Sequence, residues 1–265
     1  METETTIYYY SATGNSLAYA RAIAREIGGA RIEALARYRT TPARPGRPKV
    51  GVVFPIIAWG PPRTVKEFVS LIDLTGVRYV FAVTSCGGTA AGTMPRLRKA
   101  FRARGGDLQA GFIVRSPYYM SMQGKQAELI RRVERLSGRP FGTAAERLSE
   151  ISQTIREERR IRPERNAILG TMLGNYSHDK AVPMFTSLDA RYKVAPACTG
   201  CGTCVRVCPR GNISRDSGVT AWHHDCEFCG ACATWCPQRA IGFDRNVAMT
   251  REHNGAVSVR DFYLR

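Results

Sequence analysis

The sequence has no long hydrophobic run. No stretch approaches the roughly 18 consecutive apolar residues that a membrane-spanning helix needs, and the amino terminus lacks the basic and then apolar segment of a secretory signal. With 44% hydrophobic and 23% charged residues, the composition is typical of a globular protein. We therefore expect a chain that folds and works in the cytoplasm.

Cysteine is almost absent from most of the chain. Of the nine cysteines, only Cys86 lies outside one segment of 39 residues. The cytosol keeps thiols reduced, so this content indicates metal binding or redox chemistry rather than a disulfide framework. Cys86 by itself is more typical of a small buried residue than of a redox partner. The clustering of the other eight predicts a metal site.

The eight clustered cysteines form two copies of one pattern. Each copy reads C-x2-C-x2-C-x3-C-P, and Gly202 and Ile213 of the first copy recur as Gly230 and Ile241 in the second, at the same offset of 28 residues. In this pattern three cysteines surround one 4Fe–4S cluster, and the fourth reaches the other cluster. The predicted ligands are Cys198, Cys201, Cys204 and Cys236 for one cluster, and Cys226, Cys229, Cys232 and Cys208 for its twin.

Two zinc sites are the alternative interpretation, because four cysteines also bind zinc. Zinc cysteines usually come as separated C-x2-C pairs, whereas this segment twice has four in one run that ends in Cys-Pro. Residues 191–245 resemble a bacterial-type two-cluster ferredoxin and match both of its motifs. His223 and His224 precede Cys226, but four thiolates already complete each cluster. We interpret the histidines as loop residues or as hydrogen-bond donors near the ligands.

The region up to about residue 117 alternates short apolar or β-branched runs with segments of helical period. Such alternation is typical of a parallel sheet covered by helices. The predicted strands are residues 5–10, 31–35, 49–57, 79–85 and 108–115. The predicted helices are residues 16–27, 63–73 and 92–104. These elements predict a three-layer, doubly wound α/β domain.

The rest of the chain is less regular. A charged, helix-forming stretch covers residues 123–162 and is interrupted at 138–140, where glycine and proline should break a helix. Residues 163–192 show no clear period, so we interpret them as a connection. The expected organisation is an α/β domain with a helical extension (1–162), a linker (163–190), a small α+β domain (191–246) and a tail (247–265).

A polar loop joins the first predicted strand to the first predicted helix. It consists of Ser11, Ala12, Thr13, Gly14, Asn15 and Ser16. A helix cap would explain some of these residues, but three hydroxyls and an amide exceed what a cap needs. The N–H groups at a helix start bind anions, and hydroxyls add donors for a phosphate. Neither G-x-x-x-x-G-K-[ST] nor G-x-G-x-x-G occurs here, which argues against a triphosphate or dinucleotide.

This loop resembles the phosphate loop of flavodoxins, Ser/Thr-x-Thr-Gly-Asn-Thr/Ser. The resemblance covers about residues 4–117 and implies a flavodoxin-like five-stranded parallel sheet that binds FMN. It also implies two flavin-bracketing loops at the same sheet edge. Their candidate FMN-binding residues are Pro55, Ile56, Trp59 and Gly60 in one loop, and Thr84, Ser85, Cys86, Gly87, Gly88 and Thr89 in the other.

Aromatic residues near these loops are candidates for flavin contact. We expect Trp59 to stack on the isoalloxazine ring, although an isolated tryptophan is often a core residue. Tyr118 and Tyr119 are candidates for the flavin edge, the domain interface or the core. The second loop contains no aromatic residue, which departs from common flavodoxins. One ring face is therefore left for the ferredoxin-like region to cover.

The formal net charge of +17 has two interpretations. Two clusters and a flavin phosphate would reduce it to about +11, and the basic residues, only six of them lysines, are spread along the chain. A compositional bias toward arginine is the simpler explanation and the one we favour. If the charge has a docking role, an acidic redox partner or an anionic membrane surface is expected. No nucleic-acid-binding module is recognisable.

The whole chain resembles flavodoxin–ferredoxin fusion proteins of anaerobic bacteria and archaea. The resemblance implies electron transfer between FMN and two 4Fe–4S clusters, on behalf of a redox partner protein. Two alternatives stay open. One is a flavin-dependent reductase with its own small substrate, and the other is a cluster-containing sensor or binding protein whose flavodoxin-like domain is empty. No substrate pocket or nicotinamide fingerprint is recognisable in the sequence.

Overall fold

The computed structural model describes residues 3–87, 89–116, 128, 142–166, 168–216, 218–244 and 252–262. Gly88, Tyr118, Tyr119 and most of the stretch predicted as helix from residue 123, including the expected break at 138–140, lie outside the described residues. None of the described helices is long and apolar enough to cross a membrane.

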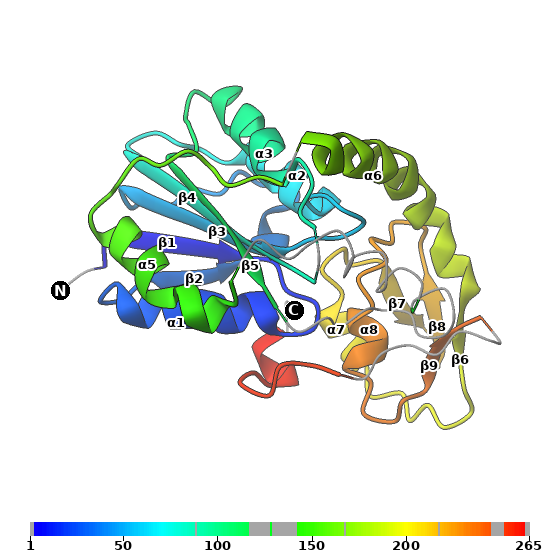
Figure 1. Cartoon of the computed structure of the whole chain (residues 1–265). Coiled ribbons are helices and arrows are strands. Elements are labelled where there is room, and N and C mark those ends of the chain that lie inside the picture. Colours follow the sequence, from blue (N-terminus) through cyan, green and yellow to red (C-terminus); the bar gives the residue numbers. More distant parts are fainter. Residues whose placement is uncertain are drawn as a thin grey trace.

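The amino-terminal half is built around a five-stranded parallel sheet (Figure 1). Its strands are β1 (Thr5–Tyr9), β2 (Arg31–Ala34), β3 (Lys49–Pro55), β4 (Tyr79–Cys86) and β5 (Ala110–Arg115). They lie in the order β2-β1-β3-β4-β5, and every adjacent pair is parallel. This is the flavodoxin-like strand order, whose ligands bind at the carboxyl edge near β1 and β3, where the order reverses. The predicted fold class is confirmed.

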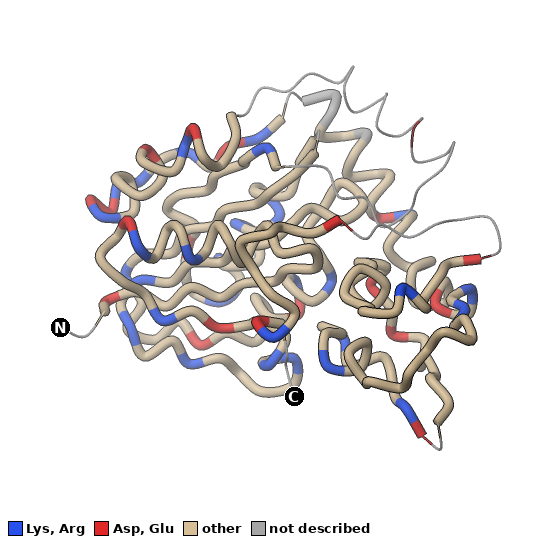
Figure 2. The backbone as a smooth tube through the Cα atoms, turned by 90° about the horizontal axis from the view of Figure 1, so that it is seen from below, with Lys and Arg blue, Asp and Glu red and all other residues tan. Residues whose placement is uncertain are grey.

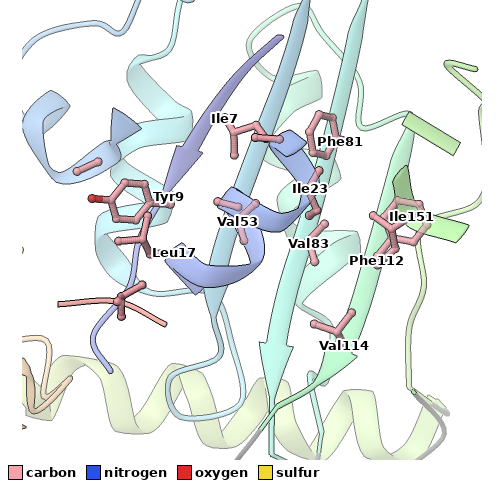
Figure 3. Packing of buried hydrophobic residues seen from close by; sticks show 14 of the residues in the cluster. Ile7, Tyr9, Leu17, Ile23, Val53, Phe81, Val83, Phe112, Val114 and Ile151 are labelled. Carbon is pink, nitrogen blue, oxygen red and sulfur yellow. The ribbon is translucent and has the colours of Figure 1, made fainter. Parts of the chain in front are cut away.

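Helices cover both faces of this sheet. On one face lie α1 (Asn15–Glu26) and α5 (Ala144–Arg156), and on the other lie α2 (Arg63–Leu71) and α3 (Thr93–Arg102). Leu17 and Ile23 of α1 and Ile151 of α5 pack against Val53 and Phe112 of the strands (Figure 3). A second buried cluster fills the α2 and α3 side. The apolar stripe predicted for the first helix is thus the face that α1 buries.

A long helix follows in the region predicted as an irregular connection. Helix α6 (Ile168–Leu188) runs from the α3 side of the sheet toward the carboxyl-terminal region (Figure 1). It contains Pro183, and its apolar residues lie on all sides rather than on one stripe. A helix whose apolar residues form no stripe gives no amphipathic signal, which is why the sequence did not indicate it.

The cysteines lie in a small α+β unit, which we call the cysteine region (residues 191–244). It contains the antiparallel pairs β6 (Tyr192–Val194) with β9 (Ile241–Phe243), and β7 (Ile213–Asp216) with β8 (Val219–Trp222). Two short helices, α7 (Thr203–Val207) and α8 (Ala231–Thr234), begin after Gly202 and Gly230, whose φ values are 69° and 74°. Both glycines adopt the left-handed conformation that glycine accepts readily. The sequence duplication is therefore also a structural repeat.

Charged residues are distributed over both parts of the molecule. Figure 2 shows lysine and arginine segments on the sheet domain and on the cysteine region, interspersed with acidic ones.

Candidate functional site

The predicted phosphate loop lies between β1 and α1, at the carboxyl edge of the sheet. Gly14 caps α1 with φ 101°, and no side chain makes a capping hydrogen bond there. Ser11, Asn15 and Ser16 are buried, and the Ser16 hydroxyl has no hydrogen-bond partner among the described residues. A buried hydroxyl normally has a partner, so this loop has the donor chemistry and the helix start that a phosphate needs.

The carboxyl-terminal segment covers this loop. The backbone N–H of Asn254 donates to the carbonyl of Thr13 at 2.8 Å, and its side-chain amide donates to Asn15 at 2.9 Å. Val257 lies so close to Gly14 that a Cβ atom on that glycine would be 2.4 Å from the valine methyl. Residues 252–262 of the expected tail are therefore docked on the loop, and we call this segment the strap. Position 14 requires glycine because its φ is positive and because Val257 of the strap lies so close to it.

The cysteine region contacts the same loop through Trp235. Its indole Nε1 donates to the carbonyl of Ala12 at 2.7 Å, and both groups are buried. The indole ring also packs against His253 and Phe262 of the strap, with ring centroids 4.5 and 4.8 Å away. Trp235 precedes the predicted ligand Cys236, so one residue links the loop, the strap and a cluster site.

The first predicted flavin loop follows β3 and has unusual backbone geometry. Ala58 and Trp59 both have positive φ, at 47° and 64°, which is uncommon for residues other than glycine and often marks a functional site. Ile57 and Gly60 close the turn by hydrogen bonds to each other. Pro55 belongs to β3, and Ile56 follows it, partly buried.

Helix α6 packs over this loop. His178 Nδ1 lies 3.0 Å from the carbonyl of Ala58, and the imidazole lies directly on Gly60, where an added Cβ atom would be 2.4 Å from the ring. Burial lowers the pKa of His178, and because the Ala58 carbonyl can only accept, the Nδ1–H of the ring donates to it. Trp59 is partly buried and lies beside Gly174 of α6. The helix missed by sequence reasoning therefore forms one wall of the candidate site.

The second predicted flavin loop begins later than expected. Thr84, Ser85 and Cys86 are part of β4, and Cys86 is buried in the core, as its sequence context suggested. The described residues of the loop itself are Gly87 and 89–92, in which Thr89 accepts a hydrogen bond from the N–H of Ala91. Gly174 of α6 packs against Ala91 as well. Both predicted loops therefore lie at the same edge, under the same helix.

The candidate site contains several unsatisfied polar groups. Four buried polar atoms here have no hydrogen-bond partner among the described residues: Ser16 Oγ, Thr93 Oγ1, Asn175 Oδ1 and His178 Nε2. They come from the start of α1, the start of α3 and the inner face of α6. Groups left unpaired in this way indicate a ligand or water that satisfies them. The two hydroxyls can donate to a phosphate or a ring carbonyl, whereas Asn175 Oδ1 and His178 Nε2 can accept from a ring N–H. These groups fit a phosphorylated ring compound that has both acceptors and a donor, as FMN has.

The cysteines fall into two groups in space. The thiols that act electrostatically on Cys204 are those of Cys201, Cys236 and Cys198, whereas those acting on Cys226 include Cys229 and Cys208. We call Cys198, Cys201, Cys204 and Cys236 the outer set, and Cys208, Cys226, Cys229 and Cys232 the inner set. Each set contains the ligands predicted for one cluster, and Cys204 also acts on Cys232 across the two sets. The crossing of Cys208 and Cys236 stays a prediction. No three His, Cys, Asp or Glu side chains among the described residues are arranged to hold a single metal ion.

The inner set faces the α/β domain. Cys229 packs against both buried clusters of that domain and lies next to Tyr10, the residue before the phosphate loop. Burial raises the pKa of both Cys226 and Cys229 to about 12. Burial likewise raises the pKa of Tyr10, with further contributions from Cys229 and Glu227. Electrons at an inner cluster would therefore be close to the carboxyl end of β1.

Buried polar contacts fix this arrangement. Glu227, 4% exposed, accepts hydrogen bonds from the N–H and hydroxyl of Thr64, at 2.8 and 2.6 Å. The N–H of Thr64 is one of the unpaired donors at the start of α2, so Glu227 satisfies that helix end. Burial raises the pKa of Glu227, and the Thr64 hydrogen bonds and Arg210 oppose this effect. No sequence pattern indicated this contact between residues 163 positions apart.

An ion-pair network surrounds the Glu227 contact. Arg210, whose side chain is 5% exposed, pairs with Asp225 at 2.9 Å and with Glu67 of α2. Asp225 also accepts from Arg63 at 2.7 Å and from Arg39 at 2.8 Å. Partly buried pairs with several partners hold geometry better than isolated surface pairs. The inner set is thus held on the α/β domain by side chains from both units.

The two histidines before Cys226 act as loop residues, as interpreted from the sequence. His224 is exposed, its Nδ1 lies 2.7 Å from the buried Asp189, and its backbone N–H donates to the same carboxylate at 2.8 Å. The N–H of His223 donates to the side chain of Asn212.

Comparison with known proteins identifies a family for the cysteine region. Residues 197–241, which include all eight clustered cysteines, match the 4Fe-4S dicluster domain family. No curated protein matches the chain. The family match confirms two 4Fe–4S clusters as cofactors of the cysteine region.

Solved structures resemble the amino-terminal part only distantly. The flavodoxin of Streptococcus pneumonia TIGR4 is 12% identical, with 58% of this chain and 98% of that chain covered and a TM-score of 0.39. A flavodoxin from the domain Archaea is 11% identical, with 57% and 99% covered and a TM-score of 0.34. The rubredoxin oxygen:oxidoreductase of Desulfovibrio gigas is 15% identical, with 59% and 36% covered and a TM-score of 0.38.

The fold of the amino-terminal part is defined by its strand order rather than by these distant likenesses. The chain joins a flavodoxin-like α/β sheet to a 4Fe–4S dicluster domain, which is the composition of a flavodoxin–ferredoxin fusion protein.

Proposed function

We propose that this protein is an electron carrier that relays single electrons between FMN and two 4Fe–4S clusters, and that it serves a redox partner protein in anaerobic metabolism. One observation carries the proposal most directly. The inner cysteine set docks on the carboxyl edge of the sheet, where Cys229 lies against Tyr10 and Trp235 bonds to Ala12 of the phosphate loop. A cofactor bound in that loop would neighbour the inner cluster.

Different residues of the chain would hold the phosphate and the ring of FMN. The Ser11–Ser16 loop and the start of α1 would bind the phosphate, while the loops at Trp59 and at residues 87–92 would flank the ring. The strap and α6 would exclude water from the two ends of the site. When bound, FMN supplies the ability to take either one or two electrons, whereas each cluster passes one.

The coverage of the site favours a relay over a reductase. A reductase must admit its own substrate to the flavin, but α6 lies on both flavin loops and the strap lies on the phosphate loop. An electron carrier needs no such access, because electrons pass through the adjoining clusters. The unsatisfied polar atoms at the site speak against the sensor alternative, in which the flavodoxin-like domain is empty.

Anaerobic reconstitution tests this proposal. We expect about eight irons, about eight sulfides and one FMN per chain, and rapid reoxidation of the reduced flavin by the clusters in a single-turnover measurement. A protein that binds no FMN, or whose bound flavin exchanges no electrons with the clusters, would contradict it.

A matched pair of variants locates the flavin. We expect Ser16→Ala to weaken FMN binding about tenfold, because a hydrogen bond to a charged phosphate contributes about 1.5 kcal/mol or more. Ser152→Ala is the control, since Ser152 of α5 is also fully buried with an unpaired hydroxyl but lies away from the loop. Equal FMN affinity in the two variants would place the phosphate elsewhere.

A further inference from the structure

The two cysteine sets differ in their access to solvent. Cys201 of the outer set is exposed, the only one of the eight clustered cysteines in that class, whereas Cys232 of the inner set is 8% exposed. The chain from Lys193 to Ala197, which leads into the outer set, is exposed as well. An outer cluster would therefore lie at the surface, and an inner cluster between it and the α/β domain.

Two arginines flank the exposed outer set. Arg206 donates to the carbonyl of Cys201 at 3.0 Å. Arg215 lies 3.7 Å from the Cys198 sulfur and donates to Thr220 at 3.1 Å. A Cβ atom on Gly200 (φ 76°) would be 2.6 Å from the Arg215 guanidinium, so this glycine lets the arginine lie flat on the loop. Both positive charges are therefore held beside the outer cysteines.

The remaining exposed charge of the cysteine region is also mainly positive. Away from the contact with the α/β domain, its cations are Arg191, Lys193, Arg206, Arg215 and Arg239, and its carboxylates are Asp216 and Asp244. Asp244 is paired with Arg191 at 2.6 Å. A cluster with four thiolates carries about −2, so without these cations the outer face would repel an acidic protein.

The inner set has a different environment. Glu227 and Asp225 lie at the contact with the α/β domain, and buried Asp189 acts electrostatically on Cys226. Asp225 is paired there with Arg210, Arg63 and Arg39, so the contact holds charges of both signs, whereas the outer side has five cations and two carboxylates. This asymmetry gives the outer set a distinct electrostatic environment and a distinct exposure.

We propose that the outer cluster is the point at which the protein exchanges electrons with its partner, that the partner is an acidic redox protein, and that Arg206 and Arg215 steer it onto the face around Cys201. This proposal rests on the electron-relay function proposed above. In each exchange one electron leaves the reduced outer cluster, which is oxidised, and reduces the oxidised centre of the partner. No bond forms or breaks and no proton is required.

One anionic and one cationic small oxidant test the electrostatic potential at the face around Cys201. The reduced holoprotein is mixed with the anion ferricyanide or with the cation hexaammineruthenium(III), and cluster oxidation is followed by absorbance at several salt concentrations. We expect oxidation by ferricyanide to slow as salt rises, because salt screens attraction. The double variant Arg206→Gln/Arg215→Gln should react about threefold to tenfold more slowly with ferricyanide at low salt, and its rate should depend less on salt.

Arg160→Gln/Arg162→Gln is the matched control. It removes two exposed arginines, so the change in net charge is the same, but these residues lie beside Gln109 at the amino edge of the sheet. Equal ferricyanide rates and salt dependences for the two double variants would overturn the proposal. The same comparison with a plant-type 2Fe–2S ferredoxin, an acidic carrier, should give the same ranking, and an unchanged rate in the Arg206/Arg215 variant would again contradict it.

Failure of the relay itself would look different. If the purified wild-type protein held clusters that accept no electron from its flavin, the proposed function would fall, whereas the salt dependence at the outer face could still be measured with clusters reduced by dithionite. Electron paramagnetic resonance of each variant confirms that both clusters are intact before the rates are compared.

Discussion

Glu227 accepts hydrogen bonds from both the backbone N–H and the hydroxyl of Thr64, although the two residues belong to different halves of the chain. The contact joins the peptide between the inner cysteines Cys226 and Cys229 to the first turn of α2. A carboxylate at a helix start is favoured by the helix dipole, so the docking of the inner set uses a site that the flavodoxin-like fold provides.

Glu227→Ala should destabilise the protein by about 2–4 kcal/mol, because it leaves the N–H and the hydroxyl of Thr64 without their buried acceptor. Glu227→Gln should cost less, since an amide oxygen can still accept from Thr64. The free energy of unfolding in urea, measured anaerobically, checks both. Glu26→Ala, at an exposed acidic position of α1, is the control and should change stability by no more than about 0.5 kcal/mol. If Glu227→Ala lowers the free energy of unfolding as little as the control does, the contact does not hold the two units together.

The crossed ligand sets predict which variants affect the same cluster. Cys198→Ser and Cys236→Ser should each remove the outer cluster, and combining them should cause no further loss, with about four irons left in every case. Combining Cys198→Ser with Cys208→Ser should remove both clusters. Iron content and electron paramagnetic resonance measure this, and Cys86→Ser is the control that should keep about eight irons. Loss of the inner cluster in Cys236→Ser would disprove the crossing.

Trp235→Phe should weaken FMN binding about fivefold. The variant keeps the aromatic packing with His253 and Phe262 but loses the hydrogen bond to Ala12, which contributes about 1 kcal/mol to the position of the loop. Titration of flavin fluorescence measures the dissociation constant. Trp222→Phe is a suitable control, because the Trp222 indole nitrogen is buried without a hydrogen-bond partner among the described residues. If both variants bind FMN alike, the Trp235 hydrogen bond does not order the loop.

We expect low pH to weaken the contact between the strap and α1. Asp261 pairs with Arg21 at 2.6 Å, and its backbone carbonyl accepts from Tyr9. The hydrogen bond with Arg21, helped by the N–H of Ser258, lowers the pKa of Asp261 to about 2. A lowered carboxyl pKa contributes stability that is complete above the unfolded-state pKa of about 4 and is lost as the pH falls toward 2.

Asp261→Asn should therefore cost about 1 kcal/mol at pH 7 and progressively less at lower pH. The measured quantity is the difference in free energy of unfolding between wild type and variant at each pH, because acid damage to the clusters affects both proteins. A difference that stays constant from pH 7 to about pH 3 would show that the ion pair does not hold the strap.

Much of the fold was accessible from local sequence patterns. The predicted strands and helices of the α/β domain agree with the observed ones to within about two residues at nearly every end, because buried parallel strands and amphipathic helices carry strong periodic signals. The matching positions of Gly202 and Gly230 in the sequence already indicated the structural repeat of the cysteine region. The expected extent of the second flavin loop was less accurate, because Thr84 to Cys86 extend β4.

Two elements of the candidate site gave no such signal. The apolar residues of helix α6 form no single stripe, and the helix contains Gly174 and Pro183, so neither its period nor its composition indicated a helix. The strap has no period of its own, and Asn254 and Val257 acquire their role only by contact with Thr13 and Gly14. Both elements are ordered by tertiary packing rather than by local propensity.

The sequence by itself determined the chemistry of the cysteine region, since a cluster motif depends on the identity and spacing of residues close together in the chain. Only the tertiary structure decided which cysteine set faces the sheet and which faces solvent. That choice depends on Glu227 with Thr64, on Trp235 with Ala12 and on the Arg210 network, whose partners are far apart in sequence. Burial and hydrogen bonding across such distances leave no periodic trace, so they appear only once the chain is folded.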